Sequence, residues 1–400
     1  METLFAKYYL KIREIREKPI RYLMKDIYWN DRLFAIVGAR GTGKTTMMLQ
    51  YIKSHLDVKK ALYVSLDDIF FSNNRLVDVA AQLSLQGVTN LFVDEIHKYP
   101  YETWAQELKN IYDTYSDMHV VFSGSSMLEI YKGNADLSRR AVQYELRGLS
   151  FREFLEFENV IKLKPISLND LLKDHIMMAS DIVKRINPKK IILLFNRYLK
   201  MGFYPYYKEN PENYAQRVAN VINTVLESDL PAIEKIEFMT TLKIKRLLGI
   251  ITTLAPFTPN ISELSKNVNT TRSHLLKSID YLERARILGL LRAKNSIGNM
   301  SKPEKIYLDN TNIAYALGGT DTNIGNVRET FFFNQLRATG EVTSSNKGDF
   351  VVQGKYTFEV GGAKKTFKQI ADIPDSYLAL DNVETGHGNR IPLWMFGLLY

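Results

Sequence analysis

The sequence contains no cysteine, so disulfide bonds, thiolate zinc sites and iron–sulfur clusters are excluded. It also has no apolar run approaching the roughly 18 residues that a membrane-spanning helix needs. Residues 1–22 mix apolar side chains with lysines and arginines, and they lack the compact apolar stretch and small-residue cleavage site of a signal peptide. We therefore expect a cytoplasmic protein without a membrane anchor.

What the sequence does contain is ordinary for a folded protein. Hydrophobic residues make up 45% and charged residues 24% of the 400 residues, which is enough apolar material for about two to four compact units. The formal net charge is +9. A positive charge of this size favours an anionic partner such as a nucleotide or a nucleic acid.

The segment from Gly38 to Thr45 matches the pattern G-x-x-x-x-G-K-T at every position. It follows an apolar run expected to be a strand, 32–37, and it precedes a segment with the pattern of a helix, 46–52. Such a loop cradles phosphates, because its glycines let backbone N–H groups turn inward. We expect Lys44 to contact the β- and γ-phosphates of ATP and the Thr45 hydroxyl to bind Mg²⁺. The expected nucleotide-binding residues are Gly38, Ala39, Arg40, Gly41, Thr42, Gly43, Lys44, Thr45 and Thr46.

A second apolar segment, Leu91–Val93, is followed directly by Asp94 and Glu95. We expect Asp94 to hold Mg²⁺ with Thr45, and Glu95 to orient or deprotonate the attacking water. The run from Asp94 to His97 also has the form of a helicase D-E-x-H box, but no second motor domain follows. We therefore expect His97 at the surface or in packing.

The expected elements alternate between strands and helices. Further strands are expected at 61–66, 119–122 and 141–146. Alternation of this kind predicts an α/β fold with a parallel sheet covered by helices on both faces. The nucleotide is then expected outside the carboxyl ends of the strands.

Three short stretches carry a family resemblance: Val93–Lys98, Ser123–Ser126 and Leu149–Phe154. They resemble the bacterial and archaeal AAA-like ATPases that carry a C-terminal domain of unknown function. The resemblance spans nearly the whole chain. It implies ATP binding and hydrolysis, a winged helix and a nuclease-like tail.

Four polar residues are candidates on the strength of their positions in AAA proteins. A polar residue after the strand at 119–122 senses the γ-phosphate there, which makes Ser123 and Ser125 candidates; the alternative is a turn of small residues. Arg139 and Arg140 stand before the next strand, where AAA proteins place the finger that reaches the γ-phosphate of a neighbouring subunit. That role requires a homo-oligomer, and the alternative is a solvated surface pair.

The resemblance and the hydrophobic periodicity together predict five segments. Residues 151–250 are expected to be mainly helical, because 168–186 and 189–198 have apolar residues at helical spacing. The segments are an N-terminal helical segment (1–31), an AAA-type P-loop core (32–150), a helical lid (151–250), a winged helix (251–310) and a small, degenerate α/β restriction-endonuclease-like domain (311–400).

Residues 258–308 have the order helix, turn, helix and β-hairpin that is typical of a winged helix. Asn260 is expected to cap the first helix, and strands are expected at 288–292 and 305–308 around a loop at 295–299. Arg292 and Lys294 would flank the wing. The alternative is a winged helix that packs only between protein domains. The candidate DNA contacts are Thr271, Arg272, Ser273, His274 and Lys277.

The last segment offers three candidate acids: Glu329 on a helix, Asp349 at the start of a strand, and Glu359 at the end of the strand 356–358. Two carboxylates across a hairpin can bind Mg²⁺ for phosphodiester hydrolysis. The E-x-K pattern of an active nuclease is broken, because Gly361 stands where the lysine is expected. Lys364, Lys365 or Gln369 could reach in, but we expect a degenerate fold kept for structure or DNA contact.

Taken together, these patterns predict an ATPase that couples its nucleotide state to a winged helix binding DNA or protein. Two alternatives stay open. One is a nucleotide-gated switch with negligible turnover, and the other is a Mg²⁺-dependent nuclease.

Overall fold

The computed structural model describes residues 1–125, 137, 139–294, 302–319 and 322–400. Ser126 and the loop expected at 295–299 lie outside this range. The chain forms two compact units: the first contains residues 1–147 and 227–236, and the second contains residues 148–226 and 237–400. Across the described ranges, no helix is both long and apolar enough to cross a membrane.

The first unit is built on a parallel five-stranded sheet with the strand order β2-β3-β4-β1-β5. β1 lies between two neighbours and all its residues are buried, whereas the edge strand β5 is partly exposed. This explains why β1 is a continuous apolar run. The α/β fold with a parallel sheet is confirmed. The strands are β1 (Leu33–Gly38), β2 (Ala61–Ser65), β3 (Asn90–Asp94), β4 (His119–Ser125) and β5 (Val142–Glu145).

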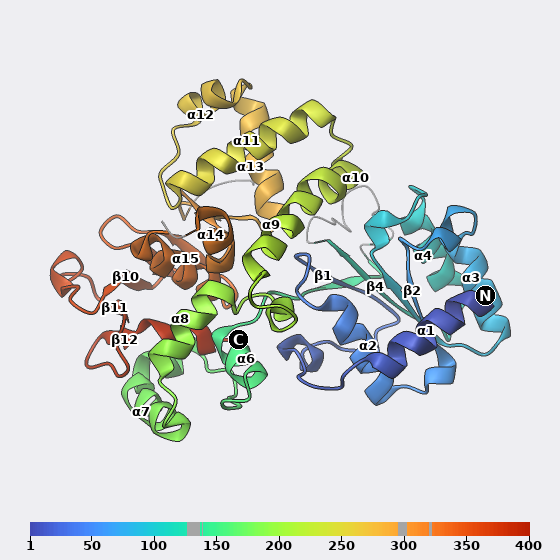
Figure 1. Ribbon diagram of the computed structural model, residues 1–400, viewed down its shortest axis with the longest axis horizontal. Coiled ribbons are helices and arrows are strands. Elements are labelled where there is room, and N and C mark those ends of the chain that lie inside the picture. Colours follow the sequence, from blue (N-terminus) through green and yellow to red (C-terminus); the bar gives the residue numbers. More distant parts are fainter. Residues whose placement is uncertain (126–136, 138, 295–301, 320–321) are drawn as a thin grey trace. The chain divides into compact units, whose positions relative to one another are not determined.

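Helices cover this sheet on both faces, with α1 and α2 on one side of the strands and α3 and α4 on the other (Figure 1). Each helix buries one stripe of apolar residues; in α1 the stripe is Leu4, Tyr8 and Ile12, spaced one turn apart. The helices of this unit are α1 (Glu2–Glu14), α2 (Lys44–His55), α3 (Leu76–Leu85), α4 (Trp104–Thr114) and α10 (Leu230–Glu234).

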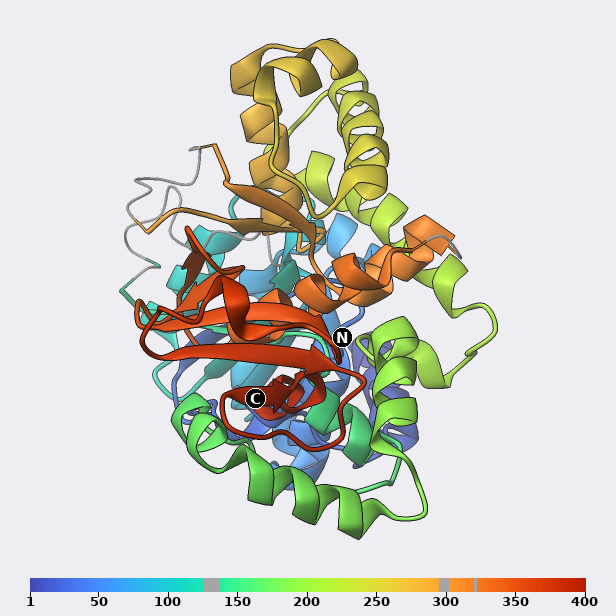
Figure 2. The same ribbon diagram turned by 90° about the vertical axis from the view of Figure 1, so that its left-hand side faces the viewer.

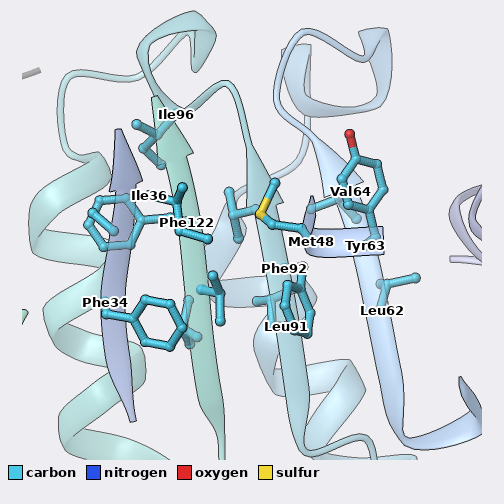
Figure 3. Packing of buried hydrophobic residues seen from close by; sticks show 14 of the residues in the cluster. Phe34, Ile36, Met48, Leu62, Tyr63, Val64, Leu91, Phe92, Ile96 and Phe122 are labelled. Carbon is cyan, nitrogen blue, oxygen red and sulfur yellow. The ribbon is translucent and has the colours of Figure 1, made fainter. Parts of the chain in front are cut away.

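The core of the first unit is packed from neighbouring strands and from α2. Figure 3 shows these side chains against one another: Phe34 and Ile36 of β1, Leu62, Tyr63 and Val64 of β2, Leu91 and Phe92 of β3, Phe122 of β4, and Met48 of α2. Burying a large apolar side chain contributes roughly 1.5–3 kcal/mol. The sheet is therefore a stable base for the loops at its strand ends.

The second unit begins with helices that pack on its C-terminal half. Helix α14 (Thr311–Gly318) contacts α8 and α9, and the Asn312 side chain donates to the carbonyls of Tyr198 and Leu199 at 3.1 and 2.9 Å. Residues 151–250, expected as a lid, therefore contribute to both units, since 227–236 belongs to the first. The helices here are α6 (Phe151–Phe157), α7 (Leu168–Ile186), α8 (Ile191–Met201), α9 (Tyr214–Thr224) and α11 (Phe238–Leu254).

Two short helices and a hairpin follow α11. Asn260 caps α12 (Ile261–Val268) by accepting from the Glu263 N–H, and Thr271 caps α13 (Arg272–Arg284) by accepting from the His274 N–H. The buried stripes are Ile261, Leu264 and Val268 on α12, and Leu275, Ile279 and Leu282 on α13. The antiparallel strands are β6 (Leu288–Leu291) and β7 (Lys305–Leu308).

A mixed five-stranded sheet completes the second unit, with the order β12-β11-β10-β9-β8 (Figure 2, orange to red). β10 runs parallel to β11 and antiparallel to β9. Glu359 was expected to end its strand, but it lies inside β10. The strand continues through Gly362 because β11 pairs with it that far. The elements are α15 (Ile324–Leu336), β8 (Val342–Ser344), β9 (Phe350–Val352), β10 (Tyr356–Gly362), β11 (Ser376–Asp381) and β12 (Arg390–Pro392).

The apolar segment 391–400 is buried along its whole length, as its composition predicts. The Tyr400 carbonyl accepts from the Ser150 hydroxyl at 2.7 Å and from Arg152 Nε at 2.8 Å. The end of the chain thus lies against α6 (Figure 1). These contacts join the first and last residues of the second unit.

Candidate functional site

The loop between β1 and α2 has a backbone that only glycine allows at two positions. A Cβ on Gly38 would lie 2.3 Å from the Leu146 carbonyl oxygen, which is far inside van der Waals contact. Gly43, the residue before α2, has φ +96°, in the left-handed region. The Thr42 hydroxyl donates to the Ala39 carbonyl at 2.9 Å and closes the loop. The amides of this loop and the N-terminus of α2 form a site for an anion.

Arg21 supports this loop from behind, which the sequence did not indicate. Its side chain is buried and donates to the Thr42 carbonyl and, at 2.7 Å, to the Arg147 carbonyl. A buried guanidinium bonded to two carbonyls fixes the loop relative to the end of β5. Arg21 is therefore a candidate positioning residue.

Lys44 lies at the first position of α2 and is buried. Its Nζ donates to the carbonyls of Gly38 and Ala39 at 2.9 and 3.1 Å, so the loop holds its own lysine. Burial lowers the pKa of Lys44, and the nearby carboxylates of Glu95 and Asp94 oppose that shift. A phosphate entering the loop would offer this ammonium group a charged partner in place of two carbonyls.

Asp94, at the end of β3, is the centre of a hydrogen-bond network. Its Oδ2 accepts from the Thr45 hydroxyl and from the Tyr63 hydroxyl, both at 2.6 Å. Its Oδ1 accepts from the Ser123 hydroxyl, which is fully buried. The strand order brings these groups to the same edge of the sheet, since β2, β3 and β4 are neighbours. Tyr63 is a site residue that the sequence analysis missed.

Glu95 follows Asp94 with φ +54°, an uncommon conformation for a residue with a side chain. Its N–H donates to Ser123 Oγ at 3.3 Å. Its Oε2 lies 3.1 Å from Nε2 of His97, whose side chain is only 2% exposed. His97 was expected at the surface or in packing; it is buried and contacts the candidate base. The backbone turn at Glu95 brings the two side chains together.

The other three sequence candidates lie at the ends of β4 and β5. Ser125 ends β4 and pairs with Gly38 in the sheet register. Arg140 forms an ion pair with Asp113 of α4 at 2.9 Å, and Arg139 is exposed. The arrangement is compatible with a surface position for both arginines before β5.

The donors around Thr45 fit a hydrated Mg²⁺ ion with a nucleotide. Mg²⁺ prefers a hydroxyl or one carboxylate together with phosphate and water oxygens, and the Thr45 hydroxyl and Asp94 carboxylate already touch. When bound, the ion would be held by the Thr45 hydroxyl and the Asp94 carboxylate and would supply positive charge beside the phosphates. Within the described part of the chain, no group of three or more histidine or acidic side chains could hold a metal ion alone. This finding agrees with an ion site in which phosphate oxygens complete the set of ligands.

Comparison with known families bears directly on this loop and sheet. Residues 30–155 match the family model described as an AAA domain. The matched range includes the P-loop and all five strands of the parallel sheet. A second match, at 192–324, is to a domain of unknown function (DUF8612). The AAA part of the resemblance is confirmed, whereas neither match concerns a nuclease-like tail.

One curated relative is the uncharacterized protein MJ1637 of Methanocaldococcus jannaschii, 23% identical over 384 residues, covering 89% of this chain and 80% of that protein. Similar solved structures include a variant of RuvB from Thermotoga maritima (16% identity, TM-score 0.28, 74% of this chain and 90% of that one). Another is the Aeropyrum pernix ORC1 protein in complex with DNA (14% identity, TM-score 0.31, 80% and 92%). At these TM-scores the likenesses carry no conclusion about this chain.

Outside the range that matches the AAA domain, the candidate DNA contacts lie at the N-cap and in the first two turns of α13. Thr271, Arg272, Ser273, His274 and Lys277 are all exposed, while the apolar stripe of the helix is buried. Arg292, which was expected to flank the wing, directly follows β6. It forms a double ion pair with Glu283 of α13, at 2.8 and 2.5 Å.

The three candidate acids of the C-terminal segment are each engaged within the second unit. Glu329 accepts from Lys305 at 2.6 Å and from the Tyr307 hydroxyl at 3.0 Å. Asp349 accepts from the Val360 N–H at 2.7 Å. Glu359 is buried and pairs with Lys365, whose side chain lies over Gly361. Of the basic residues considered, Lys365 is thus the one that reaches Glu359, whereas Gln369 lies in the short 3-10 helix Phe367–Gln369.

Proposed function

We propose that this protein is an AAA-type ATPase that binds ATP with Mg²⁺ and hydrolyses it. The observation that supports this most directly is the 2.6 Å contact between the Thr45 hydroxyl and Asp94 Oδ2. It joins the P-loop to the acid at the end of β3, which are the two protein groups that a nucleotide-bound Mg²⁺ ion needs.

Each residue of the site has a proposed role that follows from its position. The amides of residues 38–46 and the Lys44 ammonium bind the phosphates. Thr45 and Asp94 hold the ion. Glu95 accepts a proton from the attacking water or orients it. Ser123, which contacts both Asp94 and the Glu95 amide, positions that pair, and Ser125 is a second candidate.

The replacement Glu95→Gln tests hydrolysis separately from binding. The amide keeps the size of the side chain but is a very poor base, so we expect turnover to fall by about 100-fold or more while ATP affinity stays within about threefold. Steady-state ATPase assays and calorimetric titration with ATP measure the two effects. Glu102→Gln, which changes an exposed acid of the same unit, is the matched control and should match the wild type.

The outcome also separates the enzyme from a nucleotide-gated switch. If the wild-type protein binds ATP but shows no turnover above the Glu95→Gln variant, Glu95 has no catalytic role and the switch is the better account. A switch requires that ATP bind two conformations with different affinity.

For the output of the ATPase, we propose a winged helix at 251–310 that contacts DNA or protein through α13. The exposed polar and basic face of α13 supports this, as do the capped helices and the hairpin of β6 and β7. We also propose that Arg139 or Arg140 acts as an arginine finger in a homo-oligomer. Both residues precede β5, where an AAA finger is expected.

The C-terminal sheet is proposed to be a degenerate restriction-endonuclease-like domain. Gly361 stands where the lysine of the E-x-K pattern is expected, and the lysine that pairs with Glu359 is Lys365, four residues further along the chain. These observations favour a role in structure or DNA contact over Mg²⁺-dependent cleavage.

A further inference from the structure

The segment 227–236 belongs to the first unit although the chain on both sides of it belongs to the second. It starts within a π-helical turn, Val225–Asp229, and continues as α10. π-helical turns are rare in proteins, and many of those that occur lie at functional sites. This π-helical turn places the acid Asp229 inside the first unit, where only 3% of its side chain is exposed.

Asp229 contacts three residues of the nucleotide site. Both of its oxygens accept from Arg40, at 3.2 and 3.3 Å. Lys98 Nζ lies 2.5 Å from Oδ1, and His97 Nε2 lies 3.6 Å from the same oxygen. Burial raises the pKa of Asp229, but His97 and Lys98 together outweigh it and hold the pKa well below its usual range. Asp229 is therefore ionised at neutral pH.

Through these three partners, Asp229 is connected both to the proposed phosphate-binding loop and to the proposed catalytic base. Arg40 belongs to the P-loop itself. His97 Nε2, besides approaching Asp229, lies 3.1 Å from Oε2 of Glu95. One buried carboxylate on a separate segment thus contacts the phosphate-binding loop directly and the candidate base through one imidazole ring.

A bound triphosphate would compete with Asp229 for Arg40. The Arg40 side chain is 39% exposed, so its guanidinium has room to turn, and Asp229 offers it a single negative charge. Arginine prefers a phosphate in bidentate geometry at least as much as a carboxylate. Losing Arg40 would leave Asp229 with Lys98 and His97 alone in a buried site, which weakens the attachment of the segment.

We propose that Asp229 is a latch that attaches segment 227–236 to the nucleotide-free P-loop and that phosphate binding at Arg40 loosens it. The proposal rests on ATP binding as proposed above. It makes Asp229 a positioning residue, since it acts on Glu95 through His97. Because residues 227 and 236 are covalently joined to residues 226 and 237 of the second unit, loosening this segment alters two of the three chain connections between the units.

The latch predicts a reciprocal effect on affinity. If ATP must break the contact between Asp229 and Arg40, then a protein without that contact binds ATP more tightly. We expect Asp229→Asn to bind a non-hydrolysable ATP analogue about fivefold more tightly than the wild type. A purely structural role predicts the opposite sign, because a damaged site binds less well.

Hydrogen–deuterium exchange of the full-length protein, with and without the analogue and Mg²⁺, tests the latch itself. In the wild type we expect the backbone amides of 227–236 to exchange about fivefold faster once the analogue is bound. Without nucleotide, Asp229→Asn and Arg40→Gln should already exchange at that faster rate. Arg40→Gln removes the same contact by changing a half-exposed residue instead of a buried one. It therefore provides the test if Asp229→Asn fails to fold.

Glu102→Gln is the matched control, because it removes the exposed ion pair between Glu102 and Lys235 on the same segment and should leave exchange unchanged. The latch is overturned if Arg40→Gln leaves exchange in the nucleotide-free protein unchanged, or if the bound analogue does not accelerate exchange in the wild type. Calorimetry on the same samples shows whether the analogue binds. If the analogue does not bind, the proposed ATPase function is refuted, and so is the proposed loosening of the latch by phosphate.

Discussion

At the scale of single residues, Asp349 shows how the fold changes the chemistry of a side chain. Burial, with smaller contributions from Glu329 and Glu359, raises the pKa of Asp349 to about 6, although the Val360 N–H opposes the shift. A raised pKa means that folding favours the protonated form. The stability that Asp349 contributes is therefore fully present below about pH 4 and is lost as the pH rises through about 6.

The variant Asp349→Asn, which cannot ionise, should escape this loss. Between pH 4.5 and pH 8 we expect its stability relative to the wild type to improve by about 2–3 kcal/mol. Urea unfolding at both pH values measures the difference. Asp372→Asn, at an exposed position in the same region, is the control. Equal behaviour of the two variants would mean that Asp349 ionises normally.

The sequence predicted the residues of the P-loop site because phosphate chemistry fixes their spacing in one continuous stretch. It could not indicate their partners. Tyr63 is 31 residues from Asp94, and Asp229 is 189 residues from Arg40. Such contacts arise when strands and helices assemble, and no local pattern encodes them. The sequence likewise left two positions open for His97, at the surface or in packing, because its burial depends on distant segments.

At the scale of elements, the start of α6 illustrates local and tertiary stabilisation acting on one residue. The buried Ser150 hydroxyl accepts from the Glu153 N–H at 3.2 Å and donates to the Tyr400 carbonyl at 2.7 Å. We expect Ser150→Ala to lower the free energy of unfolding by about 2 kcal/mol. Ser167→Ala, which removes the exposed cap of α7 and an exposed hydrogen bond to Asp170, should cost about 1 kcal/mol. Urea unfolding compares them, and equal losses would show that the Tyr400 contact contributes nothing.

Hydrophobic periodicity predicted where the helices and strands lie, but it did not predict the residues at which they end. The strands of the parallel sheet end within three residues of the expected ranges, because buried strands are apolar throughout. β10 was the exception. Two glycines end its apolar run, yet pairing with β11 extends the strand through both of them, so Glu359 lies within the strand.

At the scale of the whole molecule, the net charge of +9 predicts how a DNA complex would respond to salt. We expect duplex DNA to bind and to stimulate ATP hydrolysis at low salt, with both effects fading as salt rises. Arg272→Gln on α13 should reduce the slope of log affinity against log salt by about 1. Fluorescence anisotropy with labelled duplex measures this, and Arg185→Gln, an exposed arginine on α7, is the control. If no DNA binding is measured at any salt concentration, the remaining proposal for α13 is contact with a protein partner.

The arrangement of segments was harder to foresee than their types. Helices at 151–201 have the periodicity expected of a lid, but periodicity reports only which face is buried. What that face packs against, here α14 and the C-terminal segment, depends on contacts between residues more than 100 positions apart.

Because the first unit is discontinuous in sequence, it cannot be isolated by simple truncation. A fragment ending at residue 147 would retain the complete G-x-x-x-x-G-K-T motif but would lack the carboxylate that Arg40 and Lys98 contact. Those two cations would then repel each other without the carboxylate that both contact. Recombinant work on the nucleotide site therefore calls for the intact polypeptide, or for a redesigned version in which residues 227–236 are grafted back by a linker.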